Sequence, residues 1–497
     1  MITQLSIEKI VGIISLIPSF SFPVFSQTMP LLATTTEAAS APLVLAGVLL
    51  SLVIIYFASE IGAEICNRLN LPEVLGQLLG GVVIGISALH LLVFVEGGGD
   101  SINSLLMTFL QTTTDLSPDS LEATFQSQNE VISILAELGS IILLFEIGLG
   151  SDLKELLRVG FQSAIVAIVG VIIPFMGGTC GLIYLFGVPT VPAIFAGAAL
   201  SATSIGITAK VLAELQYLNR TEGQIIIGAA VLDDIIGIII LAVVGSLAKI
   251  GNIEMTNVFY LVTSAAAFLI GAILLGRFLS PYFTGLVNTL KSRGQLLLSS
   301  LIFAFILSYI ATAIHLEAIL GAFAAGLLLA ETQKCRELKR QVIALADMLV
   351  PIFFVVIGAK TDLSVMNPAV PSNREGLIVA AFLILVAILG KVITGFTLFG
   401  QPQLNRLAIG IGMIPRGEVG LVFAGVGAAS GILSASLQVA IVMMVILTTF
   451  LAPPWLQAVL PSPAKDSAET GTPLLDNDKT ARFTVEQNSV VENVLES

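Results

Sequence analysis

The chain is poor in the residues that build metal clusters and disulfide frameworks. Its 497 residues include only three cysteines, Cys66, Cys180 and Cys335, and two histidines, His90 and His315. Cysteines this few and this scattered suit neither a disulfide framework nor a metal site, and two histidines leave little room for a zinc or two-metal centre. The sequence therefore argues against both kinds of centre, and we expect no cofactor.

Charged residues are also scarce. They make up 11% of the chain, and hydrophobic residues make up 56%, whereas a soluble domain has about a quarter of its residues charged. Apolar windows of roughly 20 residues, enough to cross a bilayer core of ~30 Å, recur along the chain. This composition predicts an all-α protein with many membrane-spanning helices and a lipid environment.

The apolar windows divide the chain into thirteen predicted spans, with boundaries set by charges, prolines and glycines. An earlier apolar stretch, Ile10–Phe25, is short for a span and precedes the small-residue run EAASA. Residues 1–40 are therefore expected to be a signal peptide or an extra N-terminal segment. The thirteen spans are Ala41–Ser59, Pro72–Phe94, Val131–Gly150, Gly160–Phe186, Pro192–Leu215, Gly223–Ala248, Asn257–Leu279, Gly294–Ile314, Ala318–Ala330, Ala346–Gly358, Gly376–Gly400, Leu404–Ser430 and Ser434–Leu456.

Positive charge is distributed unevenly between the two sides of these spans. Sixteen Lys and Arg residues lie in loops after odd-numbered spans or in the C-terminal tail, and four lie on the opposite side. The positive-inside rule then predicts a cytoplasmic C-terminus, with residues 457–497 as an acidic, disordered tail. The segment Glu96–Glu130, with six acids and no Lys or Arg, is expected as a loop facing the outside or a lumen. A net charge of −12 without a basic patch argues against nucleic acid as a partner.

Two pairs of segments in the chain resemble each other. LPEVLGQLLGGVVIG from Leu71 aligns with LEAILGAFAAGLLLA from Leu316, and IGLGSDL from Ile147 aligns with IGAKTDL from Ile357. The offsets are 245 and 210, and their difference of 35 is about the length of the acidic loop. The matched positions in the first alignment are Leu75/Leu320, Gly76/Gly321 and Gly81/Gly326.

Equivalent spans in this alignment are seven apart, so they cross the membrane in opposite directions. We therefore expect residues 41–250 and 294–456 to be two inverted six-helix repeats, joined by a linker helix at residues 257–279. Inverted repeats with interrupted helices are the architecture of many secondary transporters.

The run GAAVLDDIIGIII places Asp233 and Asp234 as the only charges in the span Gly223–Ala248. A charge near the bilayer centre costs at least ~2.5–3.5 kcal/mol, so such residues usually serve a function. Neighbouring side chains on a helix point about 100° apart. One aspartate is therefore expected to face an ion path and the other a packed neighbour, although the pair could also serve only to hold helices together.

Lys391 is the only charge in the span Gly376–Gly400 and is the obvious counter-charge for one aspartate. Such a pair persists in a low-dielectric interior only with good geometry. Two roles remain open for it: a static pair that fixes helix packing, or a lysine that carries a proton when its partner is displaced.

Two spans contain residues that interrupt a helix. The twelfth reads GIGMIPRGEVGLVF, with Arg416 and Glu418 at the interruption, and the fifth offers Ser201, Thr203 and Ser204 at mid-depth. Two broken helices at equivalent positions would present helix ends and free carbonyls to the midplane, where ions bind. Arg416 and Glu418 are expected to neutralise the half-helix dipoles in a supporting role.

Together these motifs resemble the monovalent cation:proton antiporter-2 family, close to bacterial and cyanobacterial sodium/proton antiporters, over about Ala41–Leu456. The resemblance implies a homodimer with a mobile core, two crossed broken helices and an elevator-like motion. It also implies an ion site in which Asp234 is the essential ion and proton ligand, and Asp233 is its partner, paired with Lys391. The motifs that carry it are LNLPEVLGQLLGGVVIG, LSATSIGITAKVLAEL, AAVLDDIIG, LGAFAAGLLLA, PIFFVVIG and GMIPRGEVGLV.

By this resemblance, Thr203 lies at the crossing, and Ser204 beside it is expected to join the ion site. Paired aspartates with a lysine favour electrogenic exchange of Na⁺ for H⁺, with K⁺/H⁺ exchange as the alternative. Candidates from other classes are an intramembrane aspartyl protease, whose Gly-x-Gly-Asp element the chain lacks, and a cation channel. No enzymatic activity is expected. The expected location is a prokaryotic plasma membrane, or the thylakoid membrane if the source is a cyanobacterium.

Overall fold

The structure, a computed structural model, describes residues 41–94, 100–114, 117–250, 256, 258–268, 271, 294–367, 371–398 and 403–460. Within these ranges every regular element is a helix. Eight of the helices are long and apolar enough to cross a membrane. The predicted all-α class is confirmed for the described ranges. The exact number of thirteen spans is not settled by them, since residues 1–40, most of the linker 257–279 and the tail beyond 460 lie outside the description.

The helices form two groups, and most helix–helix contacts lie within one group or the other. One group, here called the α5 bundle, surrounds the longest described helix and contains the pairs α2·α3, α5·α13, α5·α14 and α12·α13. Its members are α2 (Ala41–Arg68), α3 (Glu73–Ile84), α4 (Leu105–Thr114), α5 (Pro118–Gly150), α12 (Gln295–Ala313), α13 (Ala318–Ala330) and α14 (Cys335–Ala359).

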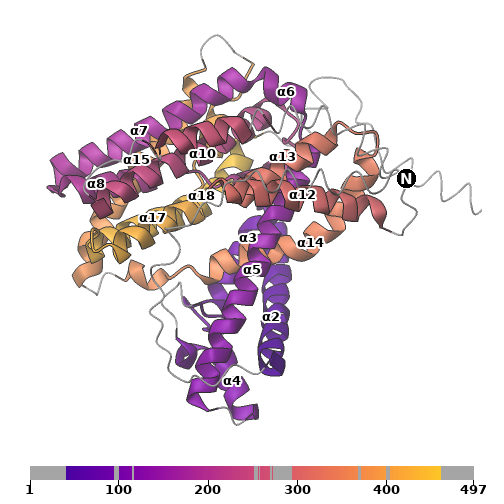
Figure 1. Ribbon diagram of the computed structural model, residues 1–497. Coiled ribbons are helices and arrows are strands. Elements are labelled where there is room, and N and C mark those ends of the chain that lie inside the picture. Colours follow the sequence, from indigo (N-terminus) through magenta and orange to yellow (C-terminus); the bar gives the residue numbers. More distant parts are fainter. Residues whose placement is uncertain are drawn as a thin grey trace, which may run out of the picture.

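The second group, here called the α10 bundle, lies at the upper left of Figure 1. The short helix α6 (Leu153–Arg158) leads into it, and the 3-10 turn η3 (Leu363–Met366) leads from α14 to α15. Its members are α7 (Gly160–Phe186), α8 (Thr190–Ala199), α9 (Ile205–Glu214), α10 (Thr221–Ile250), α15 (Pro371–Phe396), α16 (Arg406–Gly412), α17 (Glu418–Ala429) and α18 (Ala435–Val459).

The predicted span Pro72–Phe94 is wrong in length. Its helix, α3, ends at Ile84, and the following residues form turns whose amides bond back to the helix end, such as Leu91 N to Ile84 O at 2.9 Å. The helix ends where the backbone of Gly85 lies so close to Ala359 that a Cβ would not fit. Apolar composition continues through this segment because Leu92, Val93 and Phe94 are buried in the turn region.

The acidic segment 96–130 is not the plain loop that its composition suggests. It contains α4 and a short 3-10 turn (Ser101–Asn103), and its last part is the beginning of α5. The buried side chains of Leu106, Met107 and Leu110 pack α4 against Phe125 of α5. The largest extensions beyond the predicted spans are at the end of α2 and at the beginnings of α5 and α14.

Two helix crossings in the α5 bundle bring backbones into contact at glycines. Gly81 of α3 meets Gly358 of α14, and Gly326 of α13 meets Gly148 of α5. A Cβ added at any of these four glycines would collide with a carbonyl oxygen of the partner helix. The alignment of the two halves equates Gly81 with Gly326 and Gly148 with Gly358. The two crossings are therefore equivalent to each other, and each joins a helix of one half to a helix of the other.

Candidate functional site

Both predicted helix interruptions are present in the α10 bundle. Between α8 and α9 the chain runs unwound from Leu200 to Ser204, and between α16 and α17 it is unwound from Met413 to Gly417. Pro415 and Gly417 account for the second break, since proline lacks an amide donor and glycine favours non-helical backbone. Four helix ends thus lie in the same region, two of them N-terminal and two C-terminal.

Hydrogen bonds join the two unwound segments directly. The Ser204 amide donates to the Pro415 carbonyl at 2.8 Å, and the Thr203 hydroxyl donates to the Met413 carbonyl at 3.2 Å. One turn into α9, the Thr208 hydroxyl donates to the Gly412 carbonyl at 2.8 Å. These bonds satisfy carbonyls that the broken helices leave without an intrahelical partner.

Arg416 is fully buried at this crossing. Its Nη1 atom donates to the carbonyls of Ser201 and Ala202 at 3.2 and 2.5 Å, just beyond the C-terminal end of α8. Because a helix C-terminus carries a partial negative charge, a guanidinium there is favourable. Its Nε and Nη2 atoms have no protein hydrogen-bond partner. Glu418 is the first residue of α17, and its side chain lies outside the described part of the chain.

The two aspartates lie on α10 beside this crossing, both buried at 0% and 3% relative exposure for Asp233 and Asp234. Lys391 of α15, also 0% exposed, places Nζ 3.0 Å from Oδ2 of Asp233. The charges of Asp234 and Arg416 are close enough to act on Lys391. Two carboxylates and two cations are thus gathered in one buried region.

The ammonium of Lys391 lies against the backbone of α7. A Cβ added at Gly170 would come within 3.2 Å of Nζ and 3.3 Å of the Thr394 methyl carbon. Gly170 therefore provides the space that lets the lysine reach Asp233. Ion pairs of this kind need such a tight fit, because two charges removed from water are compensated only by close geometry.

The sequence-predicted residues Asp233, Asp234, Thr203, Ser204, Lys391 and Arg416 all lie at or beside the crossing. Three further contributors escaped the sequence reading: Thr208, Gly170 and Thr449, whose hydroxyl donates to the Arg416 carbonyl. The periodic recurrence of hydroxyl residues after the LSATS run points to Thr208, but nothing in the sequence identifies the other two.

The site offers oxygen atoms to a small hard cation. Among the described residues, Oδ1 of Asp233 and Oγ of Ser204 are buried without a protein hydrogen-bond partner. Monovalent and divalent hard cations prefer carboxylate, hydroxyl and carbonyl oxygens as ligands. The arrangement can therefore hold either a dehydrated cation or a proton at a buried carboxylate.

Comparison with known proteins places these features in a family. The family model for the transmembrane sodium/hydrogen exchanger matches residues 30–461. The chain is 64% identical to the "High-affinity Na(+)/H(+) antiporter NhaS3" of Synechocystis over 451 residues, 90% of this chain and 98% of that protein. It is 31% identical to the "Na(+)/H(+)-K(+) antiporter GerN" of Bacillus cereus, with 84% and 96% of the two chains covered.

A solved structure supports the fold. The sodium proton antiporter MjNhaP1 of Methanocaldococcus jannaschii superposes with a TM-score of 0.57 at 17% identity, covering 84% of this chain and 97% of that one. At that identity the likeness concerns the fold alone. With the family model matched over most of the chain, the resemblance found in the sequence motifs is confirmed. The chain belongs to the transmembrane sodium/hydrogen exchanger family.

Proposed function

We propose that the protein exchanges Na⁺ for H⁺ across a membrane, with Asp234 as the residue that binds either ion. The observation that carries this proposal is a buried carboxylate pair beside two broken helices, with one member, Asp233, held by Lys391 at 3.0 Å. We assign the exchange of positive charge to the neighbouring carboxylate, Asp234, which is buried beside the same crossing. The names of the related antiporters agree with exchange of Na⁺ for H⁺.

The mechanism is competition for one site. Either Na⁺ or H⁺ neutralises the Asp234 carboxylate, whereas the empty charged site resists moving through an apolar barrier because desolvation is costly. Asp233, Thr203 and Ser204 lie where further oxygen ligands for Na⁺ are needed. Arg416, with Glu418, serves to neutralise the half-helix ends.

Alternating access would come from motion of the α10 bundle against the α5 bundle. Among the described residues, one hydrophobic cluster lies wholly within the α10 bundle and three lie within the α5 bundle, which supports this, while two further clusters form the contact between the bundles. The paired glycine crossings support two inverted repeats, residues 41–250 and 294–456, around a linker at 257–279. We extend the proposal to an elevator-type motion in a homodimer.

Lys391 determines whether exchange moves net charge. If Lys391 stays protonated, Na⁺ and H⁺ each add one positive charge to the same site, and one-for-one exchange is electroneutral. If Lys391 releases its proton when Asp233 turns toward Na⁺, two protons exchange for one Na⁺ and transport is electrogenic. We favour the electrogenic scheme because Asp233 has an oxygen, Oδ1, without a protein partner.

K⁺ is the second candidate ion, since one related antiporter carries both Na⁺ and K⁺ in its name. The proposed location is a prokaryotic plasma membrane, or a thylakoid membrane given the cyanobacterial relative. The excess of Lys and Arg on one side supports a cytoplasmic C-terminus. No resident cofactor is proposed.

The test is ion-resolved flux in proteoliposomes, with Na⁺ and K⁺ compared across pH. We expect Na⁺-driven proton movement in the wild type and its loss in Asp234→Asn, because an amide cannot exchange a proton for a cation. The folded yield of the variant should be unchanged, since Asn is isosteric. Retained exchange in Asp234→Asn would refute the assignment, cation flux without proton movement would indicate a channel, and cleavage of a membrane peptide would indicate a protease.

A further inference from the structure

Helix α3 begins without a cap of its own. Its N-cap residue is Pro72, and no side chain of the preceding turn accepts a hydrogen bond from the first amides. The first turn of any helix leaves amide groups without intrahelical acceptors, and these carry a partial positive charge. Glu73 is at the first helical position. Its carboxylate instead accepts a hydrogen bond from the side-chain amide of Asn67 on α2 at 2.7 Å. The start of α3 therefore needs an acceptor from elsewhere in the fold.

Glu214 supplies that acceptor from the other bundle. It is the last residue of α9, and its Oε2 accepts a hydrogen bond from the Glu73 amide at 3.0 Å, 141 positions away in sequence. The next amide, that of Val74, lies close enough to interact with this carboxylate. A carboxylate that accepts a hydrogen bond from an amide of a first helical turn acts as an N-cap, here provided by a distant helix.

The ionisable groups that interact with Glu214 come from α9, α3 and α2. Lys210, one turn earlier on α9, acts on Glu214 as a favourable charge, whereas Glu73 acts as an unfavourable one. The thiol of Cys66 on α2 lies close enough to feel the Glu214 charge, and Cys66 is only 2% exposed. This hydrogen bond joins a charged side chain of the α10 bundle to a helix end of the α5 bundle.

Glu214 is connected rigidly to the crossing. Helix α9 is ten residues long, beginning at Ile205 directly after the unwound segment that bonds to the second broken helix. Movement of the crossing relative to α3 must therefore break the hydrogen bond from the Glu73 amide to Glu214. The carboxylate thus bonds the two bundles together in the arrangement seen here.

The bundles separate at a different point along α3. A partly open cavity lies between Leu78 of α3, Ile357 of α14 and Thr361, just beyond α14, on one side, and Arg416, Leu421 and Val445 of the α10 bundle on the other. The two bundles are therefore hydrogen-bonded at the N-terminal end of α3 and leave a cavity between them farther along it. A transporter that alternates between two orientations is expected to be closed at one end and open at the other in each of them, as this contact and this cavity are.

We infer that Glu214 is a positioning residue that holds the α10 bundle against the N-terminus of α3 in one of the two orientations of the transport cycle. In the other orientation, the hydrogen bond from the Glu73 amide to Glu214 is broken. The inference rests on the proposed alternating motion. It concerns the balance between orientations, and Glu214 does not touch the transported ion.

Two substitutions remove the contact from opposite sides. Glu214→Gln removes the charge, and Glu73→Pro removes one amide donor while placing proline at the first helical position, where it is well tolerated. Pro72 already has the extended backbone that a following proline requires (φ −58, ψ 139). Glu73→Ala is the matched control for the second variant, because it removes the same side chain and keeps the amide.

The measurement is the rate of maleimide labelling of Cys66 in purified protein carrying Cys180→Ser and Cys335→Ser. If labelling follows the open fraction, Glu214→Gln should accelerate it about tenfold, the range expected for charge-assisted hydrogen bonds. Glu73→Pro, which removes the amide donor and keeps the Glu214 charge beside the helix N-terminus, should accelerate it roughly threefold. Glu73→Ala should match the parent. The measurement requires no transport, so it can fail or succeed independently of the proposed exchange.

A second reporter separates a change of orientation from local loosening. Thr361→Cys, introduced with Cys66→Ser, places a thiol in the cavity that lies farther along α3. Glu214→Gln should slow its labelling while accelerating that of Cys66, because the two openings alternate. Faster labelling at both positions, or no change at Cys66, would overturn the inference.

Discussion

The molecule contains two kinds of close helix crossing, and they are built in opposite ways. In the α5 bundle, α3 crosses α14 and α13 crosses α5 as unbroken helices, with glycines at the contacts. In the α10 bundle, the helices unwind where they meet, and their backbones bond to hydroxyl, amide and guanidinium donors of the opposite segment. Both bring backbones together near the middle of the protein.

The difference shows how one fold can be both rigid and able to bind an ion. An unbroken helix satisfies its own amides and carbonyls, so a glycine crossing is held by packing alone and offers nothing polar. A broken helix gives up some of those bonds, and its free carbonyls and helix ends become available to a cation. We therefore expect steric substitutions to be most damaging in the first crossing and charge substitutions to be most informative in the second.

The largest effect is expected from Gly326→Leu. Its side chain would overlap the Phe145 carbonyl oxygen on α5, and a backbone atom cannot turn aside as a side chain does. We expect a loss above about 5 kcal/mol, beyond the usual range for overpacking, and hence no folded protein on size-exclusion chromatography. Gly425→Leu is the control, because nothing lies within 4 Å of a Cβ there.

The equivalence of the two crossings is tested by the same substitution at the matched position. Gly81→Leu should fail to fold as Gly326→Leu does. A stable Gly81→Leu protein would contradict the proposed correspondence between the two halves.

A smaller but still large effect is expected from Lys391→Gln. It leaves the Asp233 carboxylate buried without its ion-pair partner, which costs about 3–5 kcal/mol and should lower the melting temperature in detergent. Adding Asp233→Asn should restore much of the stability, because no unpaired charge remains. In proteoliposomes, the single variant should shift the reversal potential; an unchanged reversal potential would refute the role of Lys391 as a proton carrier.

The smallest effect is expected from Gly170→Ala. The added methyl group lies 3.2 Å from Nζ of Lys391 and should displace the ammonium slightly from Asp233. A cost of about 1 kcal/mol corresponds to a roughly fivefold change in apparent Na⁺ affinity, read from exchange rates. Gly177→Ala is a matched control on the same helix, since its Cβ meets a methyl group of Val386 on α15 at 3.1 Å. Equal effects of the two variants would show that crowding, and not the ion pair, is responsible.

Much of the fold follows from hydropathy and charge. The segments Gly160–Phe186 and Ala318–Ala330 agree residue for residue with α7 and α13, because turn residues flank a continuous apolar run. Pairing of Lys391 with one of the two aspartates was also predictable, since each is among very few charges in an apolar span, and the family resemblance indicated Asp233. Charged residues are costly in lipid and therefore rare in spans, so few opposite charges are available to pair with any one of them.

Other features depend on contacts that composition does not encode. Burial of Leu92, Val93 and Phe94 in turns looks the same in sequence as the continuation of a helix, so the end of α3 was misplaced. Glu214 looks like an ordinary acid at the end of a helix, and its acceptors are backbone amides, which every residue has. Gly170 is one of 45 glycines, and only the neighbouring lysine distinguishes it.

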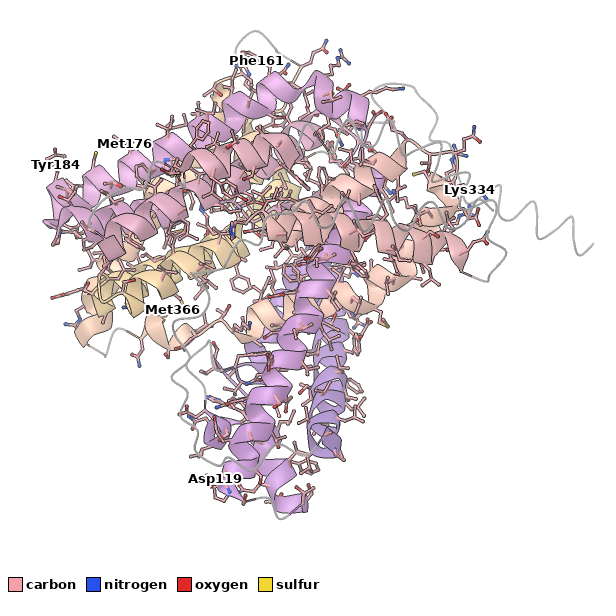
Figure 2. All side chains as sticks on the ribbon, viewed as in Figure 1. Asp119, Phe161, Met176, Tyr184, Lys334 and Met366 are labelled. Carbon is pink, nitrogen blue, oxygen red and sulfur yellow. The ribbon has the colours of Figure 1, made fainter. Side chains whose placement is uncertain are left out.

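Helix α5 has a further consequence for experiments that image the protein. Its 33 residues rise about 50 Å, well beyond a hydrocarbon core of ~30 Å. Figure 2 shows Asp119 at the far tip of this helix, with α4 beside it in Figure 1. A detergent micelle or nanodisc would therefore leave this end uncovered. It would give electron-microscope particles a visible landmark for alignment, and it offers a rigid epitope for an antibody fragment that leaves the ion site untouched.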